Sequence, residues 1–92
     1  MESESKQVTG TKKETIDILS GSQRSVDLGT NTPSLEIKIT NEGPSNSVLV
    51  SGSHYELRSG HQNTFKLGDL TSGSVITLQN KGMERARVQI SW

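Results

Sequence analysis

The sequence has no cysteine, only three aromatic residues and a single alanine. The absence of cysteine excludes disulfide frameworks, thiolate nucleophiles and cysteine-ligated zinc or iron. The longest uninterrupted aliphatic run is Val48–Val50, whereas a membrane-spanning helix needs about 20 apolar residues, so membrane insertion is not expected. With one alanine against 14 serines, 9 threonines and 9 glycines, the composition disfavours helix and favours strands joined by turns.

An excess of charge of one sign is also missing. Ten basic residues balance ten acidic residues over 92 positions, so the formal net charge is zero. No net field attracts nucleic acid, and no nucleic-acid partner is expected. The length fits one domain, which excludes separate catalytic and regulatory domains, and a hydrophobic content of 28% predicts a thin core.

The chain divides into a short tail and one domain. Residues 1–12 are polar, with Val8 the only aliphatic residue after Met1, and we expect a flexible tail there. Residues 13–92 are expected to form a single β-sandwich domain. Because no secretory signal is recognisable, a cytoplasmic location is expected if Met1 is the native start. If a leader was removed, a secreted or particle-associated location is expected instead.

Apolar and polar residues alternate along about eight short segments, a period of two that indicates strands with one buried face. Their spacing of roughly 8 to 12 residues predicts an all-β fold, an antiparallel β-sandwich of about seven or eight short strands, immunoglobulin-like or jelly-roll-like. The clearest segment is Leu35–Thr40, with three aliphatic residues on one face. The other expected inward positions are Ile16, Ile18, Val26, Leu28, Val48, Val50, Tyr55, Leu57, Phe65, Leu67, Ala86, Val88, Ile90 and Trp92, and a further strand is expected over residues 75–78.

Loop-forming residues separate these segments. Asn41–Asn46 and Asn80–Gly82 are each expected to form a hairpin loop, the second with Gly82 available for a positive φ. The last strand is expected to run from about Met83 to Trp92. No segment has an apolar period of 3.6 residues, and no internal repeat is recognised beyond the spacing of the strands.

Motifs for catalysis and phosphate binding are absent. The sequence contains no G-x-S-x-G, G-x-x-x-x-G-K or G-x-G-x-x-G pattern and no D-x-D calcium loop. The two histidines, His54 and His61, are the only imidazoles that could serve as a base for one of the many serines. Chance adjacency explains such a pairing better than a catalytic triad, so we expect neither an enzyme nor a cofactor.

One polar group is a candidate ligand-binding site: His54, Glu56, Arg58 and His61. On a strand, His54 and Glu56 share a face, with Arg58 next along that face and His61 in the following loop. Two ring nitrogens and a carboxylate are suitable ligands for a divalent metal. A solvated outer face explains the same residues more simply, so no metal site is assigned.

A second group, Arg85, Arg87 and Trp92, is a candidate interface. Arg85 and Arg87 share one face of the last strand and could contact a phosphate or sulfate group, although cross-strand ion pairing with Glu36, Glu56 or Glu84 is the simpler explanation. Trp92 shares the opposite face with Val88 and Ile90 and is expected to anchor the last strand in the core. Its alternatives are a subunit contact or stacking on a sugar.

The segment Leu35–Pro44 resembles the strand and turn that open prokaryotic immunoglobulin-like adhesion modules, where an aliphatic alternation runs into T/V-N-x-G. Gly60–Phe65 and Leu70–Leu78 are similar to the glycine-punctuated strands that follow in those modules. The resemblance covers Leu35–Trp92 and implies a binding role, without catalytic residues to transfer.

These observations together predict a non-catalytic binding or assembly module that acts through sheet faces, edges and loops, including a structural subunit of a larger particle. The partner is expected to be another protein or a second copy of the chain, because a thin core and free sheet edges both favour a homo-oligomer. The alternative is a β-sandwich that binds a small ligand or carbohydrate. A small enzyme is less favoured, because few apolar residues remain to line a pocket.

Overall fold

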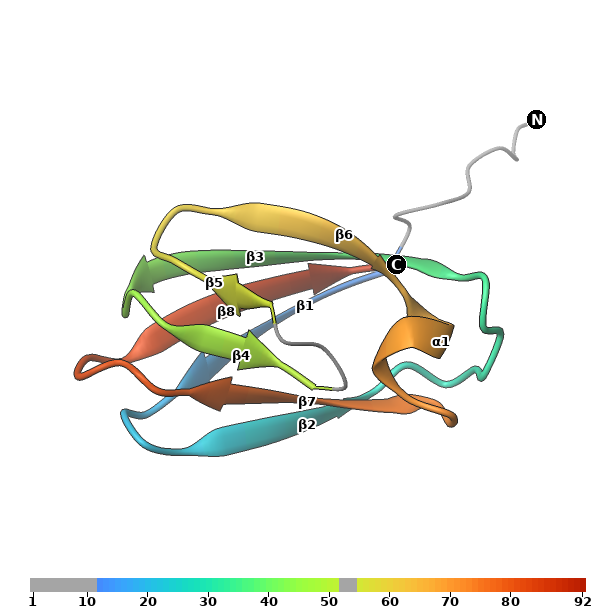
Figure 1. The fold of residues 1–92 in the computed structure, drawn as a ribbon, viewed down its shortest axis with the longest axis horizontal. Helices are drawn as coiled ribbons and strands as arrows, with labels where there is room; N and C mark the ends of the chain where they lie inside the picture. The colour runs from blue at the N-terminus through green and yellow to red at the C-terminus, as the bar shows by residue number, and fades with distance from the viewer. Residues whose placement is uncertain (1–11, 52–54) are drawn as a thin grey trace.

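The computed structural model describes residues 12–51 and 55–92, which form eight strands and one short helix in two layers (Figure 1). The elements are β1 (Lys13–Ile18), β2 (Gln23–Asp27), β3 (Glu36–Pro44), β4 (Val48–Val50), β5 (Glu56–Leu57), β6 (Gln62–Lys66), α1 (Leu67–Leu70), β7 (Val75–Asn80) and β8 (Ala86–Ser91). One sheet has the strand order β1-β8-β3-β6 and the other β2-β7-β4-β5. All pairs are antiparallel, which confirms the expected all-β sandwich.

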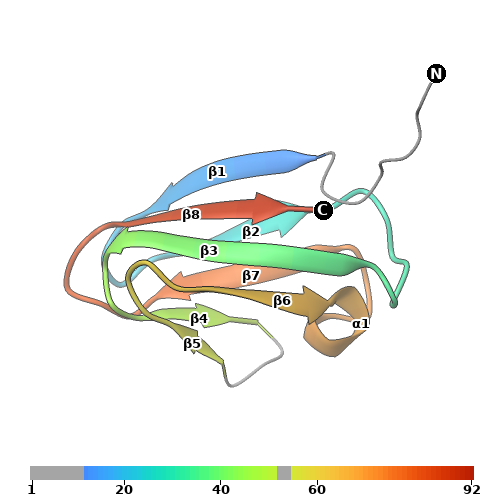
Figure 2. The same cartoon turned by 90° about the horizontal axis from the view of Figure 1, so that it is seen from above.

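The strand pairs are nested within one another. β4 pairs with β5, β3 with β6, β2 with β7, and β1 with β8, so the chain forms one long antiparallel ribbon. The ribbon coils on itself, which brings β8 beside β3 and β7 beside β4 (Figure 2). Eight strands in this order form a jelly roll. Of the two kinds of sandwich expected from the sequence, the strand order is therefore that of the jelly roll.

Branched aliphatic side chains fill the space between the two sheets. Ile37 and Ile39 of β3 and Ile76 and Leu78 of β7 are fully buried, and they belong to one continuous cluster of apolar residues. Burial of each such side chain contributes about 1.5–3 kcal/mol to folding. Tyr55 differs from the expectation, because 43% of its surface is exposed.

Two expected hairpin loops are wrong. β3 and β4 lie in different sheets, as do β7 and β8, so the segments after Asn41 and Asn80 carry the chain across the sandwich. Asparagine and glycine indicate that the chain turns but not which sheet it enters. Gly82 has no positive φ; it is needed for space, because a Cβ there would lie 2.1 Å from Oγ of Ser45. The last strand begins at Ala86, and Met83 is 94% exposed.

The helix α1 is not expected from the sequence. Its one turn follows β6 directly and buries Leu67 and Leu70, which are three residues apart and therefore share a face of a helix but not of a strand. The N–H of Gly68 donates to the carbonyl of Pro33 at 2.9 Å. A Cβ at Gly68 would lie 2.9 Å from that of Pro33, so the helix packs closely on the loop before β3.

An internal repeat relates the two halves of the sandwich, contrary to the sequence expectation. A shift of 39 residues takes Asn41 to Asn80. The same shift takes β2 to β6 and β3 to β7, so the pairing of β2 with β7 maps onto the pairing of β6 with β3. The residues identical under the shift are Ser20/Ser59, Gly21/Gly60, Gln23/Gln62, Leu28/Leu67, Gly29/Gly68, Thr32/Thr71, Ile37/Ile76, Asn41/Asn80 and Gly43/Gly82.

Backbone hydrogen bonds follow the same internal repeat. The N–H of Gly21 donates to Asn80 O at 2.9 Å, and the N–H of Gly60 donates to Asn41 O at 2.7 Å. Gly21 and Gly60 have φ values of 78° and 81°, a left-handed conformation that glycine adopts without strain. The repeat is not evident from the sequence because its identities are sparse and core-facing strand positions change in shape, as at Val26/Phe65 and Ile39/Leu78.

Candidate functional site

Four connections meet at the end of the sandwich opposite α1: residues 19–22, 45–47, 58–61 and 81–85 (Figure 1). Below we call this the four-loop end. It contains the two buried asparagines and also a surface depression with two arginines.

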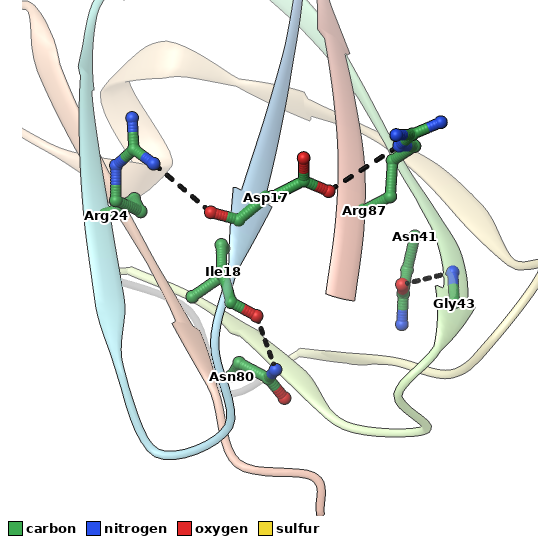
Figure 3. A network of polar contacts seen from close by, with 7 residues as sticks. All are labelled: Asp17, Ile18, Arg24, Asn41, Gly43, Asn80 and Arg87. Carbon is green, nitrogen blue, oxygen red and sulfur yellow. Dashed lines mark hydrogen bonds and ion pairs between the residues drawn. The ribbon is translucent and has the colours of Figure 1, made fainter. Parts of the chain in front are cut away.

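Asn41 is fully buried at the four-loop end and satisfies three backbone groups. Its Nδ2 donates to Ser45 O at 2.8 Å and to Leu57 O at 3.0 Å. Its Oδ1 accepts the N–H of Gly43 at 2.8 Å (Figure 3). Because buried polar groups need such partners, the side chain replaces the ladder bonds that end where the chain leaves the sheet.

Asn80 repeats this arrangement in the other half and makes four hydrogen bonds. Its Nδ2 donates to Ile18 O at 2.8 Å and to Glu84 O at 2.7 Å. Its Oδ1 accepts the N–H of Gly82 at 2.9 Å and the hydroxyl of Ser45 at 2.7 Å. The bond to Ile18 ties the end of edge strand β1 to the inner strand β7 (Figure 3).

A shallow, open depression lies at the four-loop end, with a volume of about 520 Å³. We call it the arginine depression. Its lining consists of Glu42, Gly43, Pro44, Ser59, Arg85 and Arg87.

An irregularity in β3 shapes the floor of the arginine depression. The register between β3 and β8 shifts between Asn41 and Gly43, opposite Val88 and Arg87. Gly43 has a φ of 83°, and a Cβ there would lie 2.2 Å from Oγ of Ser59. The hydroxyl of Ser59 therefore occupies the volume that a side chain at position 43 would fill. Such bulges occur often beside functional sites.

One ion pair lies at the rim of the depression. Nε of Arg87 is 3.5 Å from Oδ1 of Asp17, with 53% and 48% of the two side chains exposed (Figure 3). A pair this exposed contributes at most about 1 kcal/mol to stability. Arg87 thus has a cross-strand ion pair, but with Asp17 instead of the expected glutamates. For Arg85, no hydrogen bond or ion pair of the guanidinium occurs within residues 12–51 and 55–92.

The structure separates the three residues of the candidate interface. Arg85 and Arg87 line the same depression, whereas Trp92 packs against the core and its Nε1 donates to Leu28 O at 3.2 Å. The backbones of Trp92 and Lys12 exchange two hydrogen bonds of 2.9 Å, which extends the pairing of β1 and β8 by one residue. This position fits the expected role of Trp92 as an anchor of the last strand.

The candidate ligand group is only partly described. His54 lies outside the described residues, and Glu56, Arg58 and His61 are exposed. The carboxylate of Glu56 accepts a hydrogen bond from the hydroxyl of Ser47. Within the described ranges, no three His, Asp or Glu side chains are grouped so as to hold a metal ion.

Sequence reasoning does not find Gly43, Ser59 or Glu42 as neighbours of the two arginines. They come from β3 and from the turn before β6, far from β8 along the chain. One signal is available: the pattern Asn-x-Gly occurs at Asn41–Gly43 and again at Asn80–Gly82. Both occurrences end an inner strand, so the repeat marks the end of the sandwich where the depression lies.

At the opposite end, Asp27 closes the turn after β2. Its Oδ1 accepts the N–H of Gly29 at 2.9 Å and the hydroxyl of Ser74 at 3.0 Å. These hydrogen bonds, chiefly the one from Gly29, hold the pKa of the Asp27 carboxyl below its ordinary value.

We expect this lowered pKa to make folding sensitive to acid. A carboxyl whose pKa is lower in the folded state stabilises the fold above its unfolded pKa of about 3.9, and this contribution is lost as the pH falls through the folded value. Asp27→Asn should therefore flatten the fall in urea midpoint below about pH 4, and Ser74→Ala should flatten it less. An unchanged pH profile in Asp27→Asn would contradict the assignment. The midpoints can be followed by circular dichroism.

Comparisons with known proteins give a fold and no family. No protein-family model matches the chain, and no curated protein sequence matches it. A solved structure does: the solution NMR structure of a de novo designed double-stranded β-helix, 23% identical, with a TM-score of 0.60. The match covers 88% of this chain and 97% of the designed chain. This likeness concerns the coiled ribbon alone and says nothing of adhesion modules. In the described ranges, no helix has the length and apolar character to cross a membrane.

Proposed function

We propose that this protein is a non-catalytic binding and assembly module that self-associates through the free edge of β1. The space between the sheets supports a role without catalysis, because buried aliphatic side chains occupy it. The outer edges of the two sheets are the part of the described structure best suited to bind a partner strand. An edge strand presents unpaired N–H and C=O groups to any strand of suitable chemistry.

The hydrogen bonds between Lys12 and Trp92 define which backbone groups of β1 are free. In an antiparallel ladder, hydrogen-bonded pairs alternate with pairs that are not hydrogen-bonded. In the register of β1 and β8, the backbone groups of Lys13, Thr15 and Asp17 therefore point away from β8. One of them, the carbonyl of Asp17, accepts Nη1 of exposed Arg24 at 3.2 Å. Arg24 thus covers part of the edge and would make the association moderate in strength.

The charges along β1 make the edge complementary to itself. An antiparallel pair of β1 strands centred on Thr15 places Lys13 of one copy opposite Asp17 of the other, and the symmetry repeats this contact. Opposite charges at directly facing positions stabilise a strand pair by about 0.2–1 kcal/mol each. Self-pairing would join the four-stranded sheet that contains β1 in one copy to the same sheet of the second copy, which gives one continuous sheet of eight strands.

The other long edges have no such complementarity. In β6, the same alternation exposes the backbone of Gln62, Thr64 and Lys66, and self-pairing centred on Thr64 places Lys66 opposite Gln62. In β2, Gln23 would face Asp27. Each arrangement leaves a charge against a neutral amide, so β1 is the edge that favours a second copy.

Replacement of Thr15 by proline should abolish self-association and leave the fold intact. Proline removes the N–H that the second copy needs, and this N–H points away from the intrachain ladder, where proline is tolerated. Sedimentation velocity from micromolar to millimolar protein should show a monomer–dimer equilibrium for the natural chain and a monomer for Thr15→Pro. Circular dichroism and Trp92 fluorescence report whether the variant is folded.

Thr64→Pro is the matched control, because it places proline at the same kind of position on the other edge of the same sheet. It should retain the dimer. Lys13→Glu should weaken the dimer, since it places a second carboxylate opposite that of Asp17. A natural chain that stays monomeric at millimolar concentration, or a dimer lost in Thr64→Pro and kept in Thr15→Pro, would overturn the proposal.

A further inference from the structure

We propose that the arginine depression binds a tetrahedral oxyanion, the phosphate or sulfate group of a ligand. The site does not depend on self-association, because it lies at the four-loop end and its lining includes no residue of β1. Its two cationic groups come from β8 and the residue before it, and its hydroxyl comes from the turn before β6.

The spacing of Arg85 and Arg87 directs both guanidinium groups to the depression. Arg85 and Arg87 are two residues apart, so their side chains leave the same face about 7 Å from each other. Nε of Arg87 faces Asp17, which leaves the terminal nitrogens of the fork for another acceptor. Arginine forks bind phosphate and sulfate oxygens through paired, charge-assisted hydrogen bonds.

The hydroxyl of Ser59 supplies a third donor. The backbone N–H of Ser59 donates to Oδ1 of Asn46 at 3.2 Å, and Gly43 leaves room for the side chain of Ser59 at the depression. No hydrogen-bond partner of this hydroxyl occurs within the described parts of the chain. An unused hydroxyl beside two arginines suits an oxyanion with oxygens in several directions.

The two arginines and the free serine hydroxyl occur in one half of the internal repeat and have no counterparts in the other half. The shift of 39 residues takes Ser59 back to Ser20, whose hydroxyl donates to Gly82 O at 2.7 Å and is therefore already used. The same shift takes Arg85 and Arg87 back to Asn46 and Val48. The segment 44–48 around these two positions contains no basic residue. The scaffold is repeated, but the three donors are present once.

Charge in the depression favours an anion. Two arginines face one carboxylate within the lining, that of Glu42, and no ion pair joins Glu42 to either arginine among the described residues. Asp17, outside the lining, offsets part of the charge of Arg87. The lining alone has a formal net charge of one positive unit, which suits a single phosphate or sulfate group better than a polyanion such as nucleic acid.

Titration with sodium phosphate and with sodium sulfate, at ionic strength held constant with sodium chloride, tests the site by amide NMR. Saturable shifts should appear at Gly43, Ser59, Arg85 and Arg87 at millimolar anion. The two anions distinguish a phosphate from a sulfate preference. Arg85→Gln should weaken binding about tenfold or more, since it removes a charged donor.

Lys81→Gln is the matched control, because Lys81 takes the place of Glu42 in the repeat and its loss changes the net charge equally. Binding should be retained in this variant. Ser59→Ala should weaken binding less than Arg85→Gln does. Shifts that do not saturate, equal shifts with planar acetate, or equal losses in Arg85→Gln and Lys81→Gln would overturn the proposal. Each variant's amide spectrum without anion shows whether it is folded.

Discussion

Replacement of Asn80 by alanine should destabilise the protein by about 3–4 kcal/mol, among the largest effects of any single side-chain truncation here. The variant loses four hydrogen bonds and leaves groups such as the buried hydroxyl of Ser45 without their acceptor. A domain of this size has a total stability near the lower end of the usual range of about 5–15 kcal/mol. Urea unfolding followed by Trp92 fluorescence measures the loss.

Two further variants make this prediction specific. Asn41→Ala should cost somewhat less, about 2–3 kcal/mol, because Asn41 makes three hydrogen bonds. Asn31→Ala, in the exposed loop before β3, should lie within about 0.5 kcal/mol of the natural protein. If Asn80→Ala cost less than about 1 kcal/mol, water would be replacing the amide and the asparagine would not hold the loops together.

The fold class could be predicted from the sequence, but the roles of these two asparagines, and with them the topology, could not. Alternation in Leu35–Thr40 and around Val88 and Ile90 shows which faces are buried, because strand periodicity is a local property. The fold class follows from it. The topology does not, because Asn41 and Asn80 look like ordinary loop residues in sequence. Their side chains are fully buried and replace ladder hydrogen bonds only when distant strands such as β1 and β5 are in place.

The candidate site could be predicted only in part, because some of its residues are neighbours along the chain and others meet only in the folded protein. The spacing of Arg85 and Arg87 along one strand places both arginines on one face, and the structure brings them to one depression. Gly43 and Ser59 reach it through the pairing of β3 with β8 and through the turn before β6, which no local pattern encodes. The candidate interface groups Trp92 with the arginines, yet alternation already places it on the opposite face, where it packs on the core.

Gly82→Ala should destabilise the protein by about 2–4 kcal/mol, although the φ of Gly82 is not positive. The new Cβ would lie 2.1 Å from Oγ and 3.1 Å from Cβ of Ser45, which is buried and donates to Asn80. Ser45 would have to move, and its hydrogen bond to Asn80 would break. Urea unfolding followed by circular dichroism measures the change.

Gly73→Ala is the matched control for this crowding, because a Cβ at Gly73 meets no atom within 4 Å and the φ of Gly73 is not positive. It should be neutral or stabilise by up to about 1 kcal/mol, since alanine restricts the unfolded chain. Adding Ser45→Ala to Gly82→Ala removes the clashing oxygen, so the double variant should lose less stability than the two single losses together. Strict additivity would mean that Gly82 is required for some reason other than the room that Ser45 needs.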